Sequence, residues 1–227
     1  PGGEHGGVHA AMRYAPGAGE TSVGLDGGRL IFTKKSMGKQ ARMGKVAANP
    51  DHGEGKERPA MMQLYGHPFS SFTWKVLIAL YERALPFDFR MVDPGHPDNS
   101  AMVADAGPGG QFPVLIDGDR TVIESSAIIE YLDECYVEPP LLGRGHRIRA
   151  EVRRLSQWFD RKFNSEVTEN FVGEKIMKRF LGLGEPDSAA IRAGSANIHI
   201  HLDYIGWLTE RRGWLASDDF SLADISA

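Results

Sequence analysis

The sequence predicts a small α/β domain over residues 61–137, an all-helical domain over residues 144–227, and a disordered extension over residues 1–60. Three observations support this division. The extension is rich in glycine and poor in apolar residues. Short strand-like and helical runs then alternate as far as Cys135. Beyond Pro139-Pro140 only long stripes with helical spacing follow, so we expect the last part of the chain to be all-α.

The first 60 residues contain 13 of the 27 glycines and carry a formal charge of +3, against −7 for the remainder. Such a segment cannot bury enough apolar surface to offset the entropy lost on ordering, so we expect disorder. The sequence starts with Pro1, and Met61-Met62 immediately precedes the first strand-like run. We therefore expect translation to start at these methionines and residues 1–60 to be an upstream extension. A basic tail for an acidic partner is the weaker alternative.

Composition excludes several classes of protein. The chain is 41% hydrophobic and 25% charged, as in ordinary globular proteins, and no run approaches the roughly 18 apolar residues of a membrane span. The single cysteine, Cys135, excludes an internal disulfide framework and fits a reducing, cytoplasmic compartment. A net charge of −4 gives no electrostatic reason to expect nucleic acid. We expect no membrane, nucleic acid or metal as a partner.

The α/β domain begins with a strand at 62–65, which is short and apolar and ends before Gly66-His67-Pro68. Ser70 precedes a run whose apolar residues share one helical face, and Pro86 ends that helix. Residues 87–92 then alternate apolar and polar side chains, which predicts a second strand.

A loop rich in Pro, Gly and Asp is expected over residues 93–110. Two short strands follow at 113–116 and 120–123, and the residues Asp-Gly-Asp between them predict a hairpin turn. Ser125 opens the next helix, with Ile128, Ile129 and Leu132 facing inward. The predicted order is therefore strand, helix, strand, loop, two strands and helix.

The helical domain shows two long apolar stripes. The first runs from Ile148 to Phe163, and the second, after Pro186, runs through Ile191, Ile198, Leu202, Ile205 and Leu208. The final residues have the features of a helix start. Ser221 can cap the backbone, Asp224 can reach back, and Phe220 can pack on Ile225 across the first turn.

The order of the first elements is that of a thioredoxin-like domain, in which the reactive group lies at the start of the first helix. Here Ser70, Ser71 and Thr73 supply hydroxyls and no thiol, so disulfide exchange through a protein cysteine pair is excluded. A hydroxyl at a helix N-terminus can instead stabilise the thiolate of a bound thiol. The alternative is that Ser70 only caps the helix.

Two further features favour a peptide-like ligand. Pro113 begins a strand, and a cis peptide before it would leave the backbone N–H and C=O of Phe112 free to pair with such a ligand. Ser125 and its neighbouring amides form a second helix N-terminus, which is suited to bind a carboxylate.

Together these elements resemble the glutathione transferase family. The matching stretches are 64–66 with 70–76, 111–115, 124–132 and 220–225. The resemblance implies a thioredoxin-like domain that binds glutathione as co-substrate and a helical domain that binds a hydrophobic small-molecule electrophile. It also implies a homodimeric, cytoplasmic detoxification enzyme without a metal.

Carried over by position, the resemblance assigns three roles. Ser70 would activate the glutathione thiol, with Ser71 as the alternative hydroxyl. Gln111, Phe112 and Pro113 would hold the middle and glycine end of glutathione, with His96 as a second candidate for the glycine end. Glu124 and Ser125 would hold the γ-glutamyl end.

The resemblance also sets two alternatives to a transferase. In this family the helix begun at 220–225 is followed by more helices, so we expect the helical domain to be incomplete and the chain unstable. A truncated, inactive remnant is therefore one alternative, and a non-catalytic binding or assembly module with the same fold is the other. We expect Trp158, Phe159 and Phe163 to pack in the core, and we expect no shared metal at His199 and His201.

Overall fold

The computed structural model describes residues 20–26, 29–35, 61–93, 95–107, 109–136 and 138–227. The chain forms two compact units, Pro1–Ala47 and Ala48–Ala227. In the first unit, strands β1 (Glu20–Asp26) and β2 (Arg29–Lys35) pair antiparallel. Disorder was expected for both segments, although the two glycines between them are a signal for a hairpin turn. The remaining residues for which disorder was expected lie outside the described ranges.

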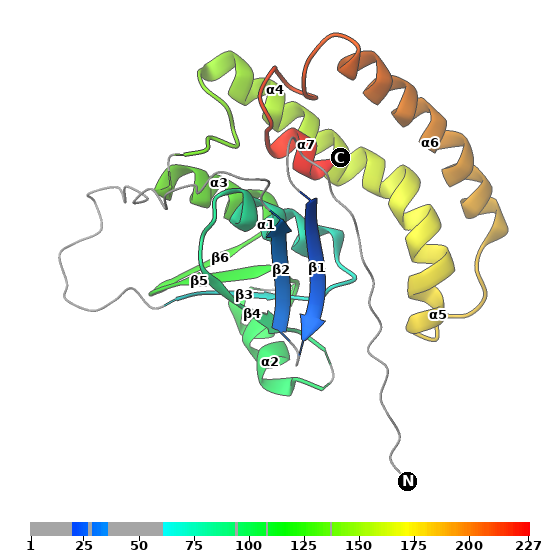
Figure 1. Ribbon diagram of the computed structural model, residues 1–227. Coiled ribbons are helices and arrows are strands. Elements are labelled where there is room, and N and C mark those ends of the chain that lie inside the picture. Colours follow the sequence, from blue (N-terminus) through cyan, green and yellow to red (C-terminus); the bar gives the residue numbers. More distant parts are fainter. Residues whose placement is uncertain (1–19, 27–28, 36–60, 94, 108, 137) are drawn as a thin grey trace. The chain divides into compact units, whose positions relative to one another are not determined.

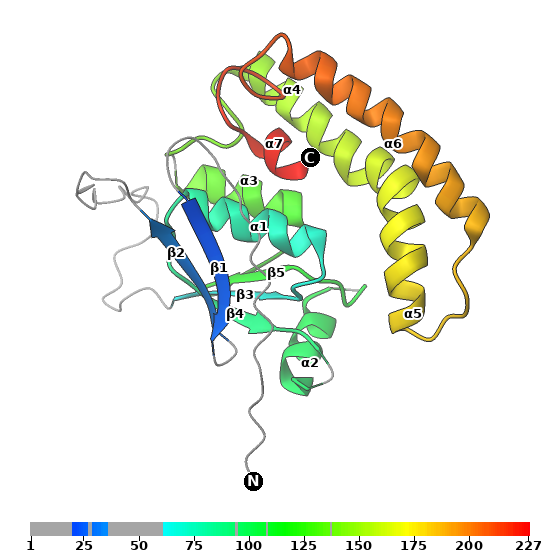
Figure 2. The same ribbon diagram turned by 45° about the vertical axis from the view of Figure 1, so that its right-hand side comes forward.

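In the second unit a four-stranded sheet has the order β4-β3-β5-β6, as Figure 1 shows. Strand β3 pairs parallel with β4 and antiparallel with β5, and β5 pairs antiparallel with β6. The two views agree that helices α1 and α3 cover one face and α2 the other (Figures 1 and 2). This is the thioredoxin-like arrangement that the element order predicted. The bounds are β3 Met62–Gly66, α1 Ser71–Glu82, β4 Phe87–Met91, α2 Pro97–Ala106, β5 Val114–Asp117, β6 Arg120–Ile123 and α3 Ser125–Cys135.

Successive side chains on the central strands enter different apolar clusters. Leu64 and Leu115 belong to the large core beneath α1 and α3, whereas Tyr65 and Val114 belong to a smaller cluster beside α2. Alternation with period two places neighbouring strand residues on opposite faces, which is why both faces must be covered.

Helix α2 corrects the expectation of a loop over residues 93–110. Only Val103 of this helix is buried, so the segment lacks the apolar stripe by which a helix is normally recognised. Its start nevertheless follows a known rule, because Pro97 occupies the first turn and Asp98 lies close to the positive end of the helix dipole.

The main part of the helical layer is one long continuous helix with an antiparallel neighbour (Figure 2). The long helix comprises α4 (His146–Gln157), η1 (Trp158–Met177) and α5 (Lys178–Phe180). In η1 the turn is wider than in an α-helix, and the N–H of Lys178 still donates to the carbonyl of Gly173, five residues back. Helix α6 (Ser188–Thr209) packs along η1.

The last helix, α7 (Leu222–Ser226), begins with the predicted capping box. The Ser221 hydroxyl accepts from the first turn, while Asp224 accepts from the Ser221 N–H at 2.9 Å. Leu222 and Ile225 are buried between the long helix and the sheet layer. The predicted helix start is therefore confirmed.

Helix α6 buries only part of the predicted face. Leu208 is buried and Ile205 packs against the core, as expected. Leu202, however, is 51% exposed, and His201 and Gly194 are buried instead. Beside η1 the α6 backbone approaches closely, and a Cβ at position 194 would lie 2.8 Å from Cβ of Asn170. Apolar periodicity therefore could not predict this contact, because residues that form it are small or polar.

One apolar core joins the sheet layer to the helical layer. It contains Val76 and Leu132 from the first and Val152, Leu208 and Leu222 from the second. Both layers therefore belong to one compact unit, and the division into domains at 61–137 and 144–227 stays a prediction. Within the described ranges, no helix is both long and apolar enough to cross a membrane.

Candidate functional site

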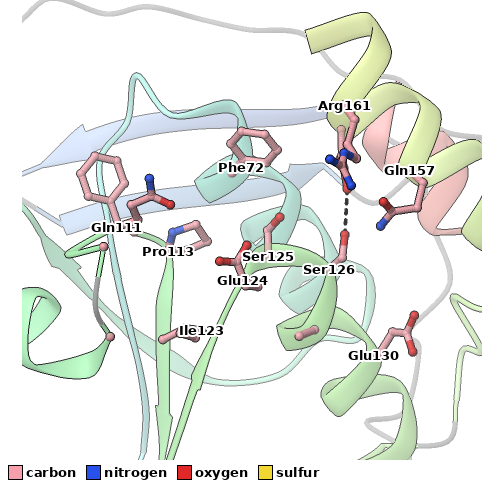
Figure 3. A pocket seen from close by; sticks show the side chains of 15 residues that line it. Phe72, Gln111, Pro113, Ile123, Glu124, Ser125, Ser126, Glu130, Gln157 and Arg161 are labelled. Carbon is pink, nitrogen blue, oxygen red and sulfur yellow. Dashed lines mark hydrogen bonds between the residues drawn. The ribbon is translucent and has the colours of Figure 1, made fainter. Parts of the chain in front are cut away.

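A cavity of about 730 Å³ lies between the sheet layer and the long helix. Its walls come from the starts of α1 and α3, the turn before β5, and the junction of α4 with η1 (Figure 3). Of the six residues predicted for the site, five line this cavity: Gln111, Phe112, Pro113, Glu124 and Ser125. A cavity of this size is typical of small-molecule sites.

The start of α3 opens into the cavity without a side-chain cap. Glu124 precedes the helix with φ +69° and ψ +116°, and its side chain makes no capping hydrogen bond. The first N–H groups of a helix have no partner within the helix, and Ser125, which is 6% exposed, begins this one. Positive φ is unfavourable for a residue with a side chain and is found mainly where surrounding structure or function requires it.

The turn before β5 has the predicted form. The Phe112–Pro113 peptide is cis, and no described residue forms a hydrogen bond with the backbone N–H or C=O of Phe112. Pro113 is buried and Gln111 is exposed at the cavity wall. The main chain of Phe112 is thus available to an extended ligand.

Ser70 is placed differently from the other five residues. Its hydroxyl accepts a hydrogen bond from the Thr73 N–H at 3.1 Å and so caps α1, and Ser70 is not among the residues that line the cavity. Phe72, in the first turn of the same helix, does line it. The turn before Ser70 lies near the cavity, since the rings of His67 and Phe112 are 6.2 Å apart.

The helical wall of the cavity was not foreseen from the sequence. It consists of Gln157, Asp160 and Arg161, and Figure 3 shows Gln157 and Arg161 on the helix opposite Pro113. These residues lie more than 20 positions beyond the end of α3 in the chain, so no local motif links them to the site.

A buried polar network connects this wall to both helices of the sheet layer. Nζ of Lys75 lies 2.6 and 2.7 Å from the carboxylate oxygens of Asp160 and 3.1 Å from the Ser126 hydroxyl. The Ser126 hydroxyl donates to Asp160 at 2.8 Å (dashed in Figure 3). Lys75 is 5% exposed, and burial lowers the pKa of its ammonium group while Asp160 opposes that shift. A lysine within the apolar stripe of α1 was the sequence signal for this network.

Other candidates lie elsewhere. Phe159 is buried and Trp158 and Phe163 pack against the core, as expected, and none of them lines the cavity. His96 contacts Asp93, with the ring nitrogen 2.8 Å from the carboxylate, outside the cavity.

Two further polar groups lie apart from the cavity. His201 Nε2 lies 3.0 Å from Glu166 on η1, and burial raises the pKa of the Cys135 thiol. Across the part of the chain that the structure describes, no three His, Cys, Asp or Glu side chains gather as a metal site would require.

Comparison with known proteins identifies the family. Residues 64–140 match the family described as "Glutathione S-transferase, N-terminal domain". A glutathione S-transferase of Silene vulgaris is 30% identical over 174 residues, which cover 72% of this chain and 77% of that protein. The chain belongs to the glutathione S-transferase family. A solved glutathione S-transferase from Rhodospirillum rubrum F11 is 48% identical, with a TM-score of 0.67 over 73% of this chain and 74% of that one.

Another relative is named for its localisation and not for an enzymatic activity. FtsZ-localized protein A of Caulobacter vibrioides is 40% identical over 168 residues, which cover 72% of this chain and 73% of that protein. Membership of the glutathione S-transferase family is therefore compatible with both an enzyme and a protein named for its localisation. The family match runs from β3 to just beyond α3 and so includes all the residues predicted to contact glutathione.

Proposed function

We propose that this protein binds glutathione in the cavity and transfers its thiolate to a small, largely apolar electrophile. The observation that carries this proposal is the convergence of three complementary groups on one cavity. The Phe112 main chain suits the cysteinyl peptide, the open start of α3 suits a carboxylate, and the Glu124 carboxylate suits an ammonium group. Glutathione carries all three partners in one short peptide.

Ser70 is the proposed activating residue. Its oxygen accepts from the Thr73 N–H, which leaves the hydroxyl hydrogen free to be donated to a sulfur. A hydrogen bond of this kind, at the positive end of α1, favours the thiolate over the thiol. The thiol proton passes to solvent, the sulfur forms a bond to the electrophilic carbon, and the leaving group departs with its electron pair.

The test is conjugation of glutathione to 1-chloro-2,4-dinitrobenzene by the wild type, Ser70→Ala and Ser71→Ala. We expect Ser70→Ala to lower kcat/KM roughly 10- to 100-fold, as loss of a hydrogen bond to a charged group does. A loss in Ser71→Ala alone would instead assign the role to Ser71. Conjugation by the wild type no faster than in buffer would contradict the proposed transferase.

A second candidate function is a non-catalytic binding or assembly module. Two observations favour it: a relative at 40% identity is named for its localisation with FtsZ, and the Ser70 oxygen is used to cap α1. Retention on immobilised glutathione separates the candidates. A module that keeps the ligand site is retained without conjugating, and Glu124→Gln weakens its retention. A protein without a glutathione site is not retained at all.

A further inference from the structure

The charged side chains of the cavity differ in whether another residue neutralises them. Both oxygens of Asp160 contact Lys75, and both oxygens of Glu130 accept from Arg153, at 2.9 and 2.8 Å. The hydrogen bond from Arg153 lowers the pKa of Glu130, which therefore remains ionised. These two carboxylates contribute little net charge to the cavity.

Glu124 and Arg161 remain. Among the residues that the structure describes, neither forms an ion pair, and both line the cavity. Glu124 lies at the start of α3, where the proposed function assigns it to the γ-glutamyl ammonium group. Arg161 lies on the helical wall, where Figure 3 shows it beside Gln157 and across from Pro113.

We propose that Arg161 selects electrophiles that carry a carboxylate, so that the second substrate is an amphipathic anion. This inference rests on the proposed function, in which glutathione occupies the side of the cavity formed by the sheet layer. The electrophile then fills the remaining side, between the Phe72 ring and the helical wall. A guanidinium group is always charged and can bind a carboxylate with two parallel hydrogen bonds.

The composition of the wall supports an anion over a wholly apolar molecule. Phe159 is part of the core, and Trp158 and Phe163 pack against it. The side chains that the long helix directs to the cavity are Gln157, Asp160 and Arg161. Because Lys75 neutralises Asp160, the uncompensated charge on this wall is positive. The Gln157 amide adds a neutral donor on the same wall of the cavity.

The experiment compares two electrophiles that differ only in charge, 4-chloro-3,5-dinitrobenzoate and 4-chloro-3,5-dinitrobenzamide. In both, the thiolate forms a C–S bond, the C–Cl bond breaks and chloride leaves. The readout is the ratio of their kcat/KM values in each variant, so that intrinsic reactivity cancels between variants. Arg161→Gln removes the charge, Arg161→Lys keeps it, and Lys162→Gln makes the same charge change at a residue that pairs with Glu166 outside the cavity.

We expect Arg161→Gln to lower the benzoate-to-benzamide ratio about five- to tenfold, Arg161→Lys to retain part of it, and Lys162→Gln to leave it unchanged. The KM for glutathione should stay constant. An unchanged ratio in Arg161→Gln overturns the inference. If the KM for glutathione rises at the same time, Arg161 holds a carboxylate of glutathione itself instead.

A protein that does not catalyse is tested through binding. The S-conjugates of the same two compounds are titrated by calorimetry into the wild type and Arg161→Gln. Preference of the wild type for the carboxylate conjugate, lost in Arg161→Gln, supports the inference even if the proposed catalysis fails. Equal binding of both conjugates by the wild type overturns it.

Discussion

The two helices that cover the same face of the sheet begin in opposite ways. At α1 the Ser70 hydroxyl accepts from the backbone and completes the first turn. At α3 the preceding residue, Glu124, makes no such bond and is held at φ +69° at the edge of the cavity. One start is satisfied within the chain, and the other leaves backbone donors for a ligand.

The difference extends to what supports each start. The α1 cap is local, formed by residues three apart, whereas the second residue of α3, Ser126, is held by Lys75 and Asp160 from two other helices. An open helix start needs such support because its ligand contacts must already be in position before binding. Three changes test the comparison: removing the Asp160 support of α3, removing the Ser70 cap of α1, and relieving the backbone strain at Glu124.

Removing the support should have the largest effect. Asp160→Ala leaves the ammonium group of Lys75 buried without an anion, and we expect the free energy of unfolding to fall by about 3 kcal/mol. Urea unfolding followed by circular dichroism measures the change. The double variant Lys75→Met/Asp160→Leu should recover most of the loss, because it buries no charge. A double variant no more stable than Asp160→Ala would show that the charge is not the cause.

Removing the cap should have a smaller effect. Ser70→Ala leaves the Thr73 N–H without its acceptor, and we expect a loss of about 1 kcal/mol in unfolding free energy. Ser70→Asp, which can still cap, should retain most of it. Ser125→Ala is the matched change at the other helix start and should alter stability by less than about 0.5 kcal/mol. Equal losses in both alanine variants would remove the distinction between a capped and an open start.

The sequence predicted most of the sheet layer because each of its elements has a local pattern. Short apolar or alternating runs and turn residues identified the strands. In the helical layer, the pair Ser221 and Asp224 identified the start of α7. Helix α2 was missed because it buries only Val103. The contact residues of α6 were missed because they are small or polar, as at Gly194.

Within the site, too, the features with a local sequence pattern were predicted and the others were missed. The cis peptide before Pro113 and the open helix start at Ser125 were predicted from short motifs. The helical wall was not predicted, for two reasons. Asp160 contacts Ser126 across 34 positions of the chain. Asp160 also lies in η1, whose wide turn departs from the period of about 3.6 residues of an α-helix. A face assigned with α-helical spacing therefore differs from the face that lines the cavity.

Removing the strain should have the smallest effect on stability and one of opposite sign. Glycine adopts φ +69° without a steric cost, so we expect Glu124→Gly to raise the free energy of unfolding by about 0.5 to 1 kcal/mol after its greater chain entropy is counted. The same substitution removes the carboxylate proposed to hold the γ-glutamyl ammonium group. Calorimetry should therefore give a Kd for glutathione that is about tenfold higher.

Ala84 provides the matched control, because it also has positive φ, at +51°, and it follows α1 outside the cavity. We expect Ala84→Gly to gain stability by a similar amount and to bind glutathione as the wild type does. If Glu124→Gly lowered stability while Ala84→Gly raised it, the Glu124 side chain would be contributing to the fold rather than being held against it. If both variants bound glutathione equally well, the Glu124 carboxylate would have no role in binding, and the γ-glutamyl ammonium group would need another partner.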